Sequence, residues 1–489
     1  MRRWMIRGPL YAIGLCAVVL ATIVLMFAIQ ARLRLPELHA WHKVALPAEF
    51  RAGRSTTPGS FADYRRLEDR LFAELRARVI DDPSAADSQM LGRYNPKSVT
   101  ARLALDTPYN RSFELAPEHP RGGVLLVHGL SDSPYSMRGI AEEFFAQGYY
   151  VLVLRLPGHG TIPASLVDVT WQDWYAAVAL AAKHAQAAAG PGKPFLAGGH
   201  STGAALVTLY AVRALEDPGL PRPERLYLVS AAIGISRFAV LTNVIAGLSF
   251  IPGFEKSRWI DVLPEYDPYK YNSFPVNAAN QIYKLTHVLA GALEEAGNAG
   301  RLSSMPRVLV FQSIVDATVT AREVVSGLLA LLPPRGHELV VFDVNRRERL
   351  QGLIAPEPME DLEKLRVATD LPFRLTLIGN RRDGSAAIAA YTREPGGRDV
   401  AVEDLPFEWP AGVISLGHVA LPFPPDDPVY GLTPKPGAQP EFHLGVVAVR
   451  GESGALMVPL GVFARLRCNP FFEIIRTRID RSLLHDEVP

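Results

Sequence analysis

From about residue 111 the chain repeats a pattern of short, uninterrupted apolar runs separated by turns and helical stretches, and this pattern constrains the fold more than any other feature. Six such runs occur, at residues 124–127, 149–156, 194–197, 226–229, 308–311 and 339–342. A continuous apolar run of this length is expected for a strand that is buried on both faces. Strands of this kind that alternate with helices predict an α/β domain with a mostly parallel, doubly wound sheet.

The N-terminus carries a longer apolar segment. Residues 9–29 form an uncharged run of 21 residues, which is long enough to cross a bilayer as a helix. Arginines flank it at positions 2, 3, 7, 32 and 34. Residues 27–31 fit the small-x-small cleavage site of a signal peptide poorly, so we expect an uncleaved transmembrane anchor, with the N-terminus in the cytoplasm and the rest of the chain outside. A cleaved signal peptide and a buried core helix remain as alternatives.

Residues 30–104 connect this segment to the main domain, which is expected to occupy residues 105–489. Residues 35–55 are polar and interrupted by Pro and Gly, which is typical of a stalk. Apolar residues then recur at helical spacing and predict an amphipathic helix that packs on the main domain. They are Phe61, Leu67, Leu71, Leu75 and Val79.

The charge balance and the cysteine content exclude two classes of protein. Lys and Arg total 51 against 50 Asp and Glu, so the chain has no overall field that would attract nucleic acid. Of its two cysteines, Cys16 lies in the N-terminal run and Cys468 has no obvious intramolecular partner, so no disulfide framework is expected.

A G-x-S-x-G motif follows the third apolar run, at residues 199–203. A Ser at a strained strand-to-helix turn needs glycine on either side, because side chains there would collide with neighbouring backbone. The motif lies between an apolar strand and the helix-forming residues 204–207, which is the context that such a turn requires. Ser201 is therefore predicted to be a nucleophile.

The segment His128-Gly129-Leu130-Ser131 comes directly after the first apolar run. It is either a simple strand-ending turn or an oxyanion loop. In the second case the backbone N–H groups of Leu130 and Thr202 would both point at the oxyanion that develops during acyl transfer. His128 would then have a structural role, since it precedes the nucleophile.

In this arrangement the acid and the base follow the nucleophile in the order Ser, acid, His. Asp316 comes after the 308–311 strand, where it is predicted to be the acid and could also cap the helix expected at 318–332; Asp343 is the alternative. His418 follows residues 412–417, interpreted as a strand and turn, and is predicted to be the base, with His443 as the alternative. His337 lies at the wrong end of its strand, and His485 lies near the C-terminus.

No metal or phosphate-loop motif is complete. His337-Glu338 would begin a zinc-binding H-E-x-x-H, but residue 341 is Val. Gly192-Lys193 is followed by Pro instead of the Ser or Thr of a phosphate loop.

Taken together, these residues resemble the lysophospholipase, monoacylglycerol-lipase and serine-aminopeptidase-like branch of the α/β-hydrolases. The matching stretches are residues 126–134, 155–160 and 171–174, the turn around Ser201, and the neighbourhoods of Asp316 and His418. The resemblance covers roughly residues 105–345 and 411–480. It departs from the family where 102 positions separate Asp316 from His418, which indicates an inserted, hairpin-bearing subdomain at residues 344–411.

The resemblance implies an α/β-hydrolase fold with a helical cap at residues 237–300, a Ser201–His418–Asp316 triad that acts through an acyl-enzyme, and no metal or organic cofactor. The apolar residues at 240–254 could line an acyl channel, face a bilayer or simply pack on the core. Our leading hypothesis is an esterase that acts on lipid-like or other hydrophobic acyl esters. A peptidase or acyltransferase with the same triad, and a catalytically silent membrane-tethered scaffold, are the alternatives.

Overall fold

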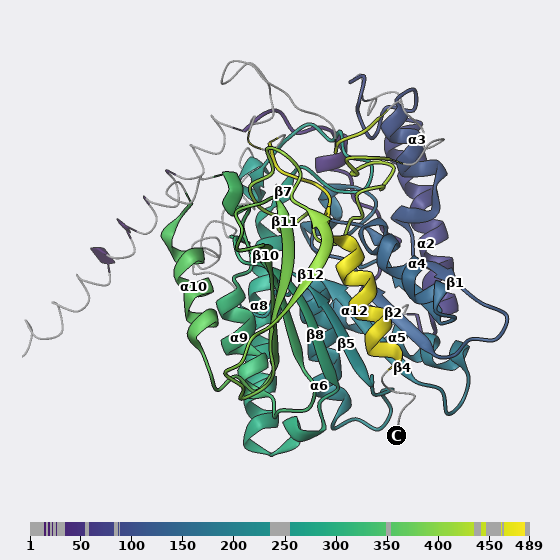
Figure 1. The fold of residues 1–489 in the computed structure, drawn as a ribbon. Coiled ribbons are helices and arrows are strands. Elements are labelled where there is room, and N and C mark those ends of the chain that lie inside the picture. Colours follow the sequence, from purple (N-terminus) through teal and green to yellow (C-terminus); the bar gives the residue numbers. More distant parts are fainter. Residues whose placement is uncertain are drawn as a thin grey trace, which may run out of the picture.

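The six apolar runs predicted to be strands lie parallel to one another in a single sheet. The computed structural model describes residues 35–53, 58–82, 87, 89–234, 255–348, 354–434, 442–445 and 464–484, and a few isolated positions. These residues form a ten-stranded sheet in the order β1-β3-β2-β4-β5-β8-β9-β10-β11-β12 (Figure 1). The predicted strands are β2 (Gly123–Val127), β3 (Tyr150–Leu154), β4 (Phe195–His200), β5 (Arg225–Val229), β8 (Arg307–Ser313) and β9 (Glu338–Phe342). Every residue of β2 to β5 is buried, which confirms the interpretation of the apolar runs.

The sheet continues beyond these strands at both edges. β1 (Phe113–Leu115) pairs antiparallel with β3. At the other edge β10 (Arg374–Asn380) lies parallel to β9, and β11 (Ala387–Arg393) and β12 (Ala401–Glu408) follow antiparallel. The hairpin predicted within residues 344–411 is therefore present, but it does not form a subdomain of its own. It extends the main sheet, because the edge of β9 offers unpaired N–H and C=O groups to β10.

Helices cover both faces of the sheet, and alternate strand residues point to opposite faces. Leu125 and Val127 pack with the helices of one face, whereas Val124 and Leu126 pack with those of the other. The first face carries α5 (Trp171–Ala189), α6 (Thr202–Ala214), α8 (Val276–Asn298), α9 (Ala321–Gly327) and α10 (Pro356–Val367). The second face carries α4 (Arg138–Ala146) and α12 (Phe472–Leu484).

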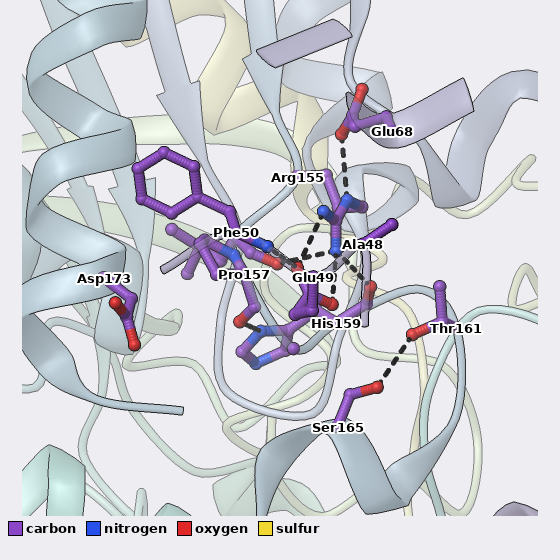
Figure 2. Close-up of polar contacts among 12 residues, drawn as sticks. Ala48, Glu49, Phe50, Glu68, Arg155, Pro157, His159, Thr161, Ser165 and Asp173 are labelled. Carbon is purple, nitrogen blue, oxygen red and sulfur yellow. Dashed lines mark hydrogen bonds and ion pairs between the residues drawn. The ribbon is translucent and has the colours of Figure 1, made fainter. Parts of the chain in front are cut away.

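The residues before β1 belong to the same body. The amphipathic helix predicted from residues 61–79 is α2 (Phe61–Leu75) with a π-helical turn at Arg76–Ile80, and α3 (Val99–Asp106) follows. The prediction of a stalk was wrong for residues 35–53, which lie against the domain. A few apolar side chains in this polar segment are buried, namely Leu38, Trp41, Leu46 and Phe50. Glu49, from the same segment, forms a buried ion pair with Arg155 (Figure 2).

Of the predicted cap at 237–300, the described part is residues 255–300. It contains a short hairpin of β6 (Trp259–Asp261) and β7 (Phe274–Pro275), followed by α8, which contacts α6. The predicted membrane anchor at residues 9–29 lies outside the described residues, apart from isolated positions. Within the described part of the chain, no helix combines the length and the apolar character that a membrane span needs.

Candidate active site

Ser201 occupies the turn between β4 and α6 with a strained backbone. Its φ is 54° and its ψ is −114°, a region that residues with a side chain rarely adopt. The flanking glycines permit this turn. A Cβ at Gly203 would lie 2.0 Å from the carbonyl oxygen of Val127, and one at Gly199 would lie 2.4 Å from the carbonyl carbon of Gly203. The Ser201 N–H donates to the Val229 carbonyl oxygen at 2.9 Å, which ties the turn to β5.

The structure brings Asp316 and His418 together although 102 positions separate them: Nδ1 of His418 lies 2.7 Å from Oδ2 of Asp316. The second carboxylate oxygen, Oδ1, accepts the N–H groups of Thr318 at 2.9 Å and Val319 at 3.0 Å. Burial alone would raise the pKa of Asp316, but His418 and these N–H donors hold it below its ordinary value. An ionised carboxylate at this position favours the proton on Nδ1 of His418, which leaves Nε2 free to accept a proton.

The segments around these two residues differ from their predicted structure. Residues 412–417 are irregular and form no strand; the side chain of Asn345 donates to the Val413 carbonyl oxygen at 2.9 Å, and Ser313 Oγ donates to that of Leu416 at 2.6 Å. The helix expected at 318–332 is α9 with a 3-10 turn at Leu329–Leu331. Its N-cap is Thr320, so Asp316 does not cap it.

The alternative acid and bases have other surroundings. Asp343 forms ion pairs with Arg346 and Arg366. His337 Nδ1 accepts the N–H of Val308 at 3.1 Å, at the start of β8 and thus at the opposite end of the sheet from Ser201. His443 is absent from the residues lining the cavity at Ser201.

The predicted oxyanion donors lie beside Ser201. Val127, at the end of β2, pairs with Gly199 of β4, and this register brings the turns that follow the two strands together. Thr202 is the first residue of α6, so its N–H has no acceptor within the helix. Leu130 and Thr202 both line the same cavity as Ser201 and His418.

His128 is enclosed and hydrogen-bonded on both ring nitrogens. Its Nε2 accepts the N–H of Leu156 at 3.0 Å, and its Nδ1 lies 2.8 Å from the Gly129 carbonyl oxygen. Burial lowers the pKa of His128 from 6.5 to about 4. The ring is therefore neutral at pH 7, with Nδ1 as donor, and holds the turn after β2 against the end of β3.

We expect this buried neutral histidine to make the free energy of unfolding depend on pH. Between about pH 4 and 6.5 the unfolded chain binds a proton at residue 128 that the folded chain does not, so stability rises with pH through this window and levels off above it. The contribution is on the order of 3 kcal/mol. Urea unfolding at a series of pH values gives the free energy of unfolding as a function of pH. Between pH 4 and 6.5 this free energy should rise less steeply with pH in His128→Gln than in the parent. Equal pH dependence in the two proteins would show that His128 is not buried in its neutral form.

Sequence reasoning missed a group of ionisable residues beside the nucleophile. Asp132 lies 3.4 Å from Lys270 Nζ and 3.4 Å from Nδ1 of His200, whose Nε2 lies 3.3 Å from the backbone oxygen of His418. Burial would raise the pKa of Asp132, but the Lys270 ammonium and the His200 ring hold it well below its usual range. His200 belongs to the G-x-S-x-G motif at 199–203 and Asp132 to the stretch 126–134, but no spacing rule links either residue to Lys270.

The cavity at Ser201 has a volume of about 430 Å³. One wall is apolar and comes partly from the cap: Leu130, Ile260, Phe274, Ala279, Ile282, Val319 and Val419. Asp132, Lys270 and Arg465 supply charge elsewhere in the lining. Among the described residues, no group of three or more His, Cys, Asp or Glu side chains is placed to hold a metal ion.

The topology and the position of Ser201 together decide the fold. The strands β3-β2-β4-β5-β8-β9 run parallel, the serine stands in a tight turn after β4, and a carboxylate follows β8. The fold is that of an α/β-hydrolase. The family model described as "Serine aminopeptidase, S33" matches residues 118–253 of this chain, a segment that contains the Ser201 turn.

Individual proteins are similar to other lengths of this chain. A thermostable monoacylglycerol lipase from Bacillus sp. (strain H-257) is 48% identical over 56 residues, which are 12% of this chain and 22% of that lipase. The chain thus spans about a fifth of the length of this curated relative. A metagenome-derived lipolytic enzyme is 23% identical, with coverage of 53% of this chain and 99% of the other and a TM-score of 0.37. A soluble variant of monoglyceride lipase from Saccharomyces cerevisiae is 12% identical, with 47% and 82% coverage and a TM-score of 0.37.

Proposed function

We propose that this α/β-hydrolase is a serine esterase that cleaves carboxylic esters of hydrophobic acyl groups. The observation that carries the proposal is the hydrogen bond of 2.7 Å between His418 and Asp316, made by a histidine that lines the same cavity as Ser201. A nucleophile, a base and an orienting carboxylate are the three groups that acyl transfer through a serine needs.

The reaction proceeds through an acyl-enzyme. Nε2 of His418 takes the proton of Ser201 Oγ as this oxygen attacks the ester carbonyl carbon, and the N–H groups of Leu130 and Thr202 stabilise the resulting oxyanion. When the tetrahedral intermediate collapses, the C–O bond to the alcohol breaks and His418 gives the proton to the departing oxygen. Water then attacks the acyl-enzyme by the same route, with His418 as base, and the carboxylic acid leaves.

The cavity at Ser201 is suited to a hydrophobic acyl group. The volume of the cavity, about 430 Å³, falls within the usual range of small-molecule sites, and the cap residues Ile260, Phe274 and Ile282 make part of its wall apolar. The short match to a monoacylglycerol lipase points the same way.

The charges of the cavity argue against an aminopeptidase. Such an enzyme needs a carboxylate to bind the free amino group of its substrate. Among the described residues of the lining, the one carboxylate is that of Asp132, and Lys270 and His200 already contact it.

Replacing Ser201 by Ala is expected to lower the rate of ester hydrolysis by about 10⁴- to 10⁶-fold, because the acyl-enzyme can no longer form. The measurement uses p-nitrophenyl esters of increasing acyl length, together with labelling by a fluorophosphonate. Ser326→Ala, at an exposed serine of α9, is the matched control and should keep full activity. A folded parent protein that neither hydrolyses any ester nor takes up the label would contradict the proposal and favour a silent scaffold.

We further propose that residues 9–29 tether the enzyme to a membrane, with the catalytic domain on the extracytoplasmic side. The support is the length and apolar character of this run. Removal of residues 1–34 is expected to release an active, soluble enzyme from the membrane fraction, whereas removal of residues 1–53 should also unfold it, since Trp41 and Phe50 are buried. Cell fractionation with alkaline extraction tests the membrane tether. Protease accessibility in intact cells tests the side on which the catalytic domain lies. Full-length protein that is found in the soluble fraction would contradict the anchor.

A further inference from the structure

A second and larger cavity lies along the same edge of the sheet as the active site. Its volume is about 730 Å³. It begins at the carboxyl ends of β9 and β10, where Asp343 follows β9 and Asn380 ends β10, and it extends along β10 and β11 as far as the paired residues Leu375 and Arg393. Ser201 follows β4 at this edge too, but the two cavities share no lining residue. Open α/β sheets bind their ligands at the carboxyl ends of their strands, and one end of this cavity lies at that edge.

The walls of this cavity are strongly basic. The lining contains one carboxylate, that of Asp343, among the described residues. Against it stand six arginines: Arg346, Arg347, Arg366, Arg381, Arg382 and Arg393. For a chain whose net charge is +1, this is a local concentration of positive charge that the overall composition does not require.

Asp343 holds two of these guanidinium groups in place. Its Oδ2 lies 3.0 Å from Nε of Arg346 and 3.1 Å from a terminal nitrogen of Arg366. A Cβ at Gly379 would lie 3.3 Å from Asp343, so the glycine leaves room for this carboxylate against β10. One buried negative charge therefore arranges two positive groups and leaves an excess of positive charge.

The other four arginines differ in the partners that the chain gives them. Arg381 pairs with Asp404 and Asp383, and Arg393 donates to the carbonyl oxygens of residues 365, 366 and 368 at the end of α10. Arg382 lies over the ring of Tyr391, 5.5 Å from its centre. Neither Arg347 nor Arg382 has a carboxylate partner in the part of the chain that the structure describes.

We propose that this cavity binds a phosphate ester, either a soluble organic phosphate or the headgroup of an anionic phospholipid. The planar fork of a guanidinium matches phosphate oxygens bidentately, and a phosphoryl group offers three acceptor oxygens and up to two negative charges to several arginines at once. The cavity is large enough for an organic group beside the phosphate, and Leu375, Leu377 and Tyr391 supply apolar surface for it. This site is independent of the chemistry at Ser201.

The test is a calorimetric titration of the full-length chain with glycerol 3-phosphate. We expect saturable binding to one site that weakens by about tenfold or more in the double variant Arg347→Gln/Arg382→Gln, since each lost guanidinium removes charge-assisted hydrogen bonds. The matched control, Arg70→Gln/Arg398→Gln, removes the same charge from two exposed arginines outside the cavity and should bind like the parent. Malonate, a dicarboxylate of similar charge, should bind more weakly.

A second arm separates the two sources of phosphate. Flotation of the full-length chain with phosphatidylcholine vesicles, with and without phosphatidylglycerol, should show a phosphatidylglycerol-dependent gain that the cavity variant loses if the ligand is a lipid headgroup. A gain in this arm without binding of glycerol 3-phosphate supports the lipid source. Equal weakening by the two double variants, equally tight binding of malonate, or no cavity-dependent binding in either arm would overturn the proposal. None of these readouts uses ester hydrolysis, so they stand apart from the test of Ser201.

Discussion

Replacing Asp316 by Asn is expected to lower kcat for ester hydrolysis by about 10⁴-fold while the protein remains folded. The reason lies in the donors around this carboxylate. The N–H groups of Thr318 and Val319 approach Oδ1, so the oxygen of the asparagine amide would turn toward them. The amide NH₂ would then face Nδ1 of His418, which would have to become an acceptor. The ring proton would move to Nε2, and the base could no longer accept the proton of Ser201.

The same substitution also places two hydrogen-bond donors opposite each other. Gln312 Nε2 donates to Oδ2 of Asp316 at 3.2 Å, and in the variant this donor would meet the NH₂ group. Asp370→Asn, at an exposed position, is the matched control and should keep full activity. In Asp316→Asn, kcat from steady-state kinetics and the rate of fluorophosphonate labelling should fall by similar factors. A loss of activity in Asp343→Asn with full activity in Asp316→Asn would reverse the assignment of the acid.

The parts of this structure that sequence predicted well are those that short-range patterns determine. A strand covered on both faces must be apolar at every position, so residues 124–127 and 226–229 were recognisable without their partners. The turn at Ser201 was recognisable because its steric demand on residues 199 and 203 falls within five consecutive residues.

The parts that sequence predicted poorly depend on contacts between distant segments. Residues 35–53 have the composition of a stalk, and what makes them part of the domain is the fit of a few side chains such as Trp41 and Phe50 against surfaces formed elsewhere. The hairpin at 374–393 was recognisable, but its attachment to β9 depends on which sheet edge is open. The basic cavity combines residues from five separate stretches between 343 and 400, none of which forms a motif.

Replacing Arg155 by Met is expected to lower the free energy of unfolding by about 3–5 kcal/mol. The Arg155 side chain is fully buried and lies between two buried carboxylates, 3.0 Å from Glu49 Oε1 and 2.9 Å from Glu68 Oε1 (Figure 2). It also donates to the carbonyl oxygen of His159 at 3.0 Å. These contacts join residues 35–75 to the loop after β3, and Met would leave two carboxylates buried without a counter-charge.

We expect the loss of stability to arise because the carboxylates of Glu49 and Glu68 stay buried without a counter-charge, and not because the guanidinium itself is lost. Adding Glu49→Gln and Glu68→Gln to Arg155→Met should recover part of the free energy of unfolding measured in urea, because burial of a neutral amide costs less free energy than burial of an unpaired carboxylate. Arg374→Met, which breaks an exposed ion pair with Glu394, is the matched control and should cost less than about 1 kcal/mol. If Arg155→Met costs no more than this control, the segment at 35–53 is held by its apolar side chains alone. A large loss in Arg155→Met with partial recovery in the triple variant would show that the ion pairs join the N-terminal segment to the catalytic domain.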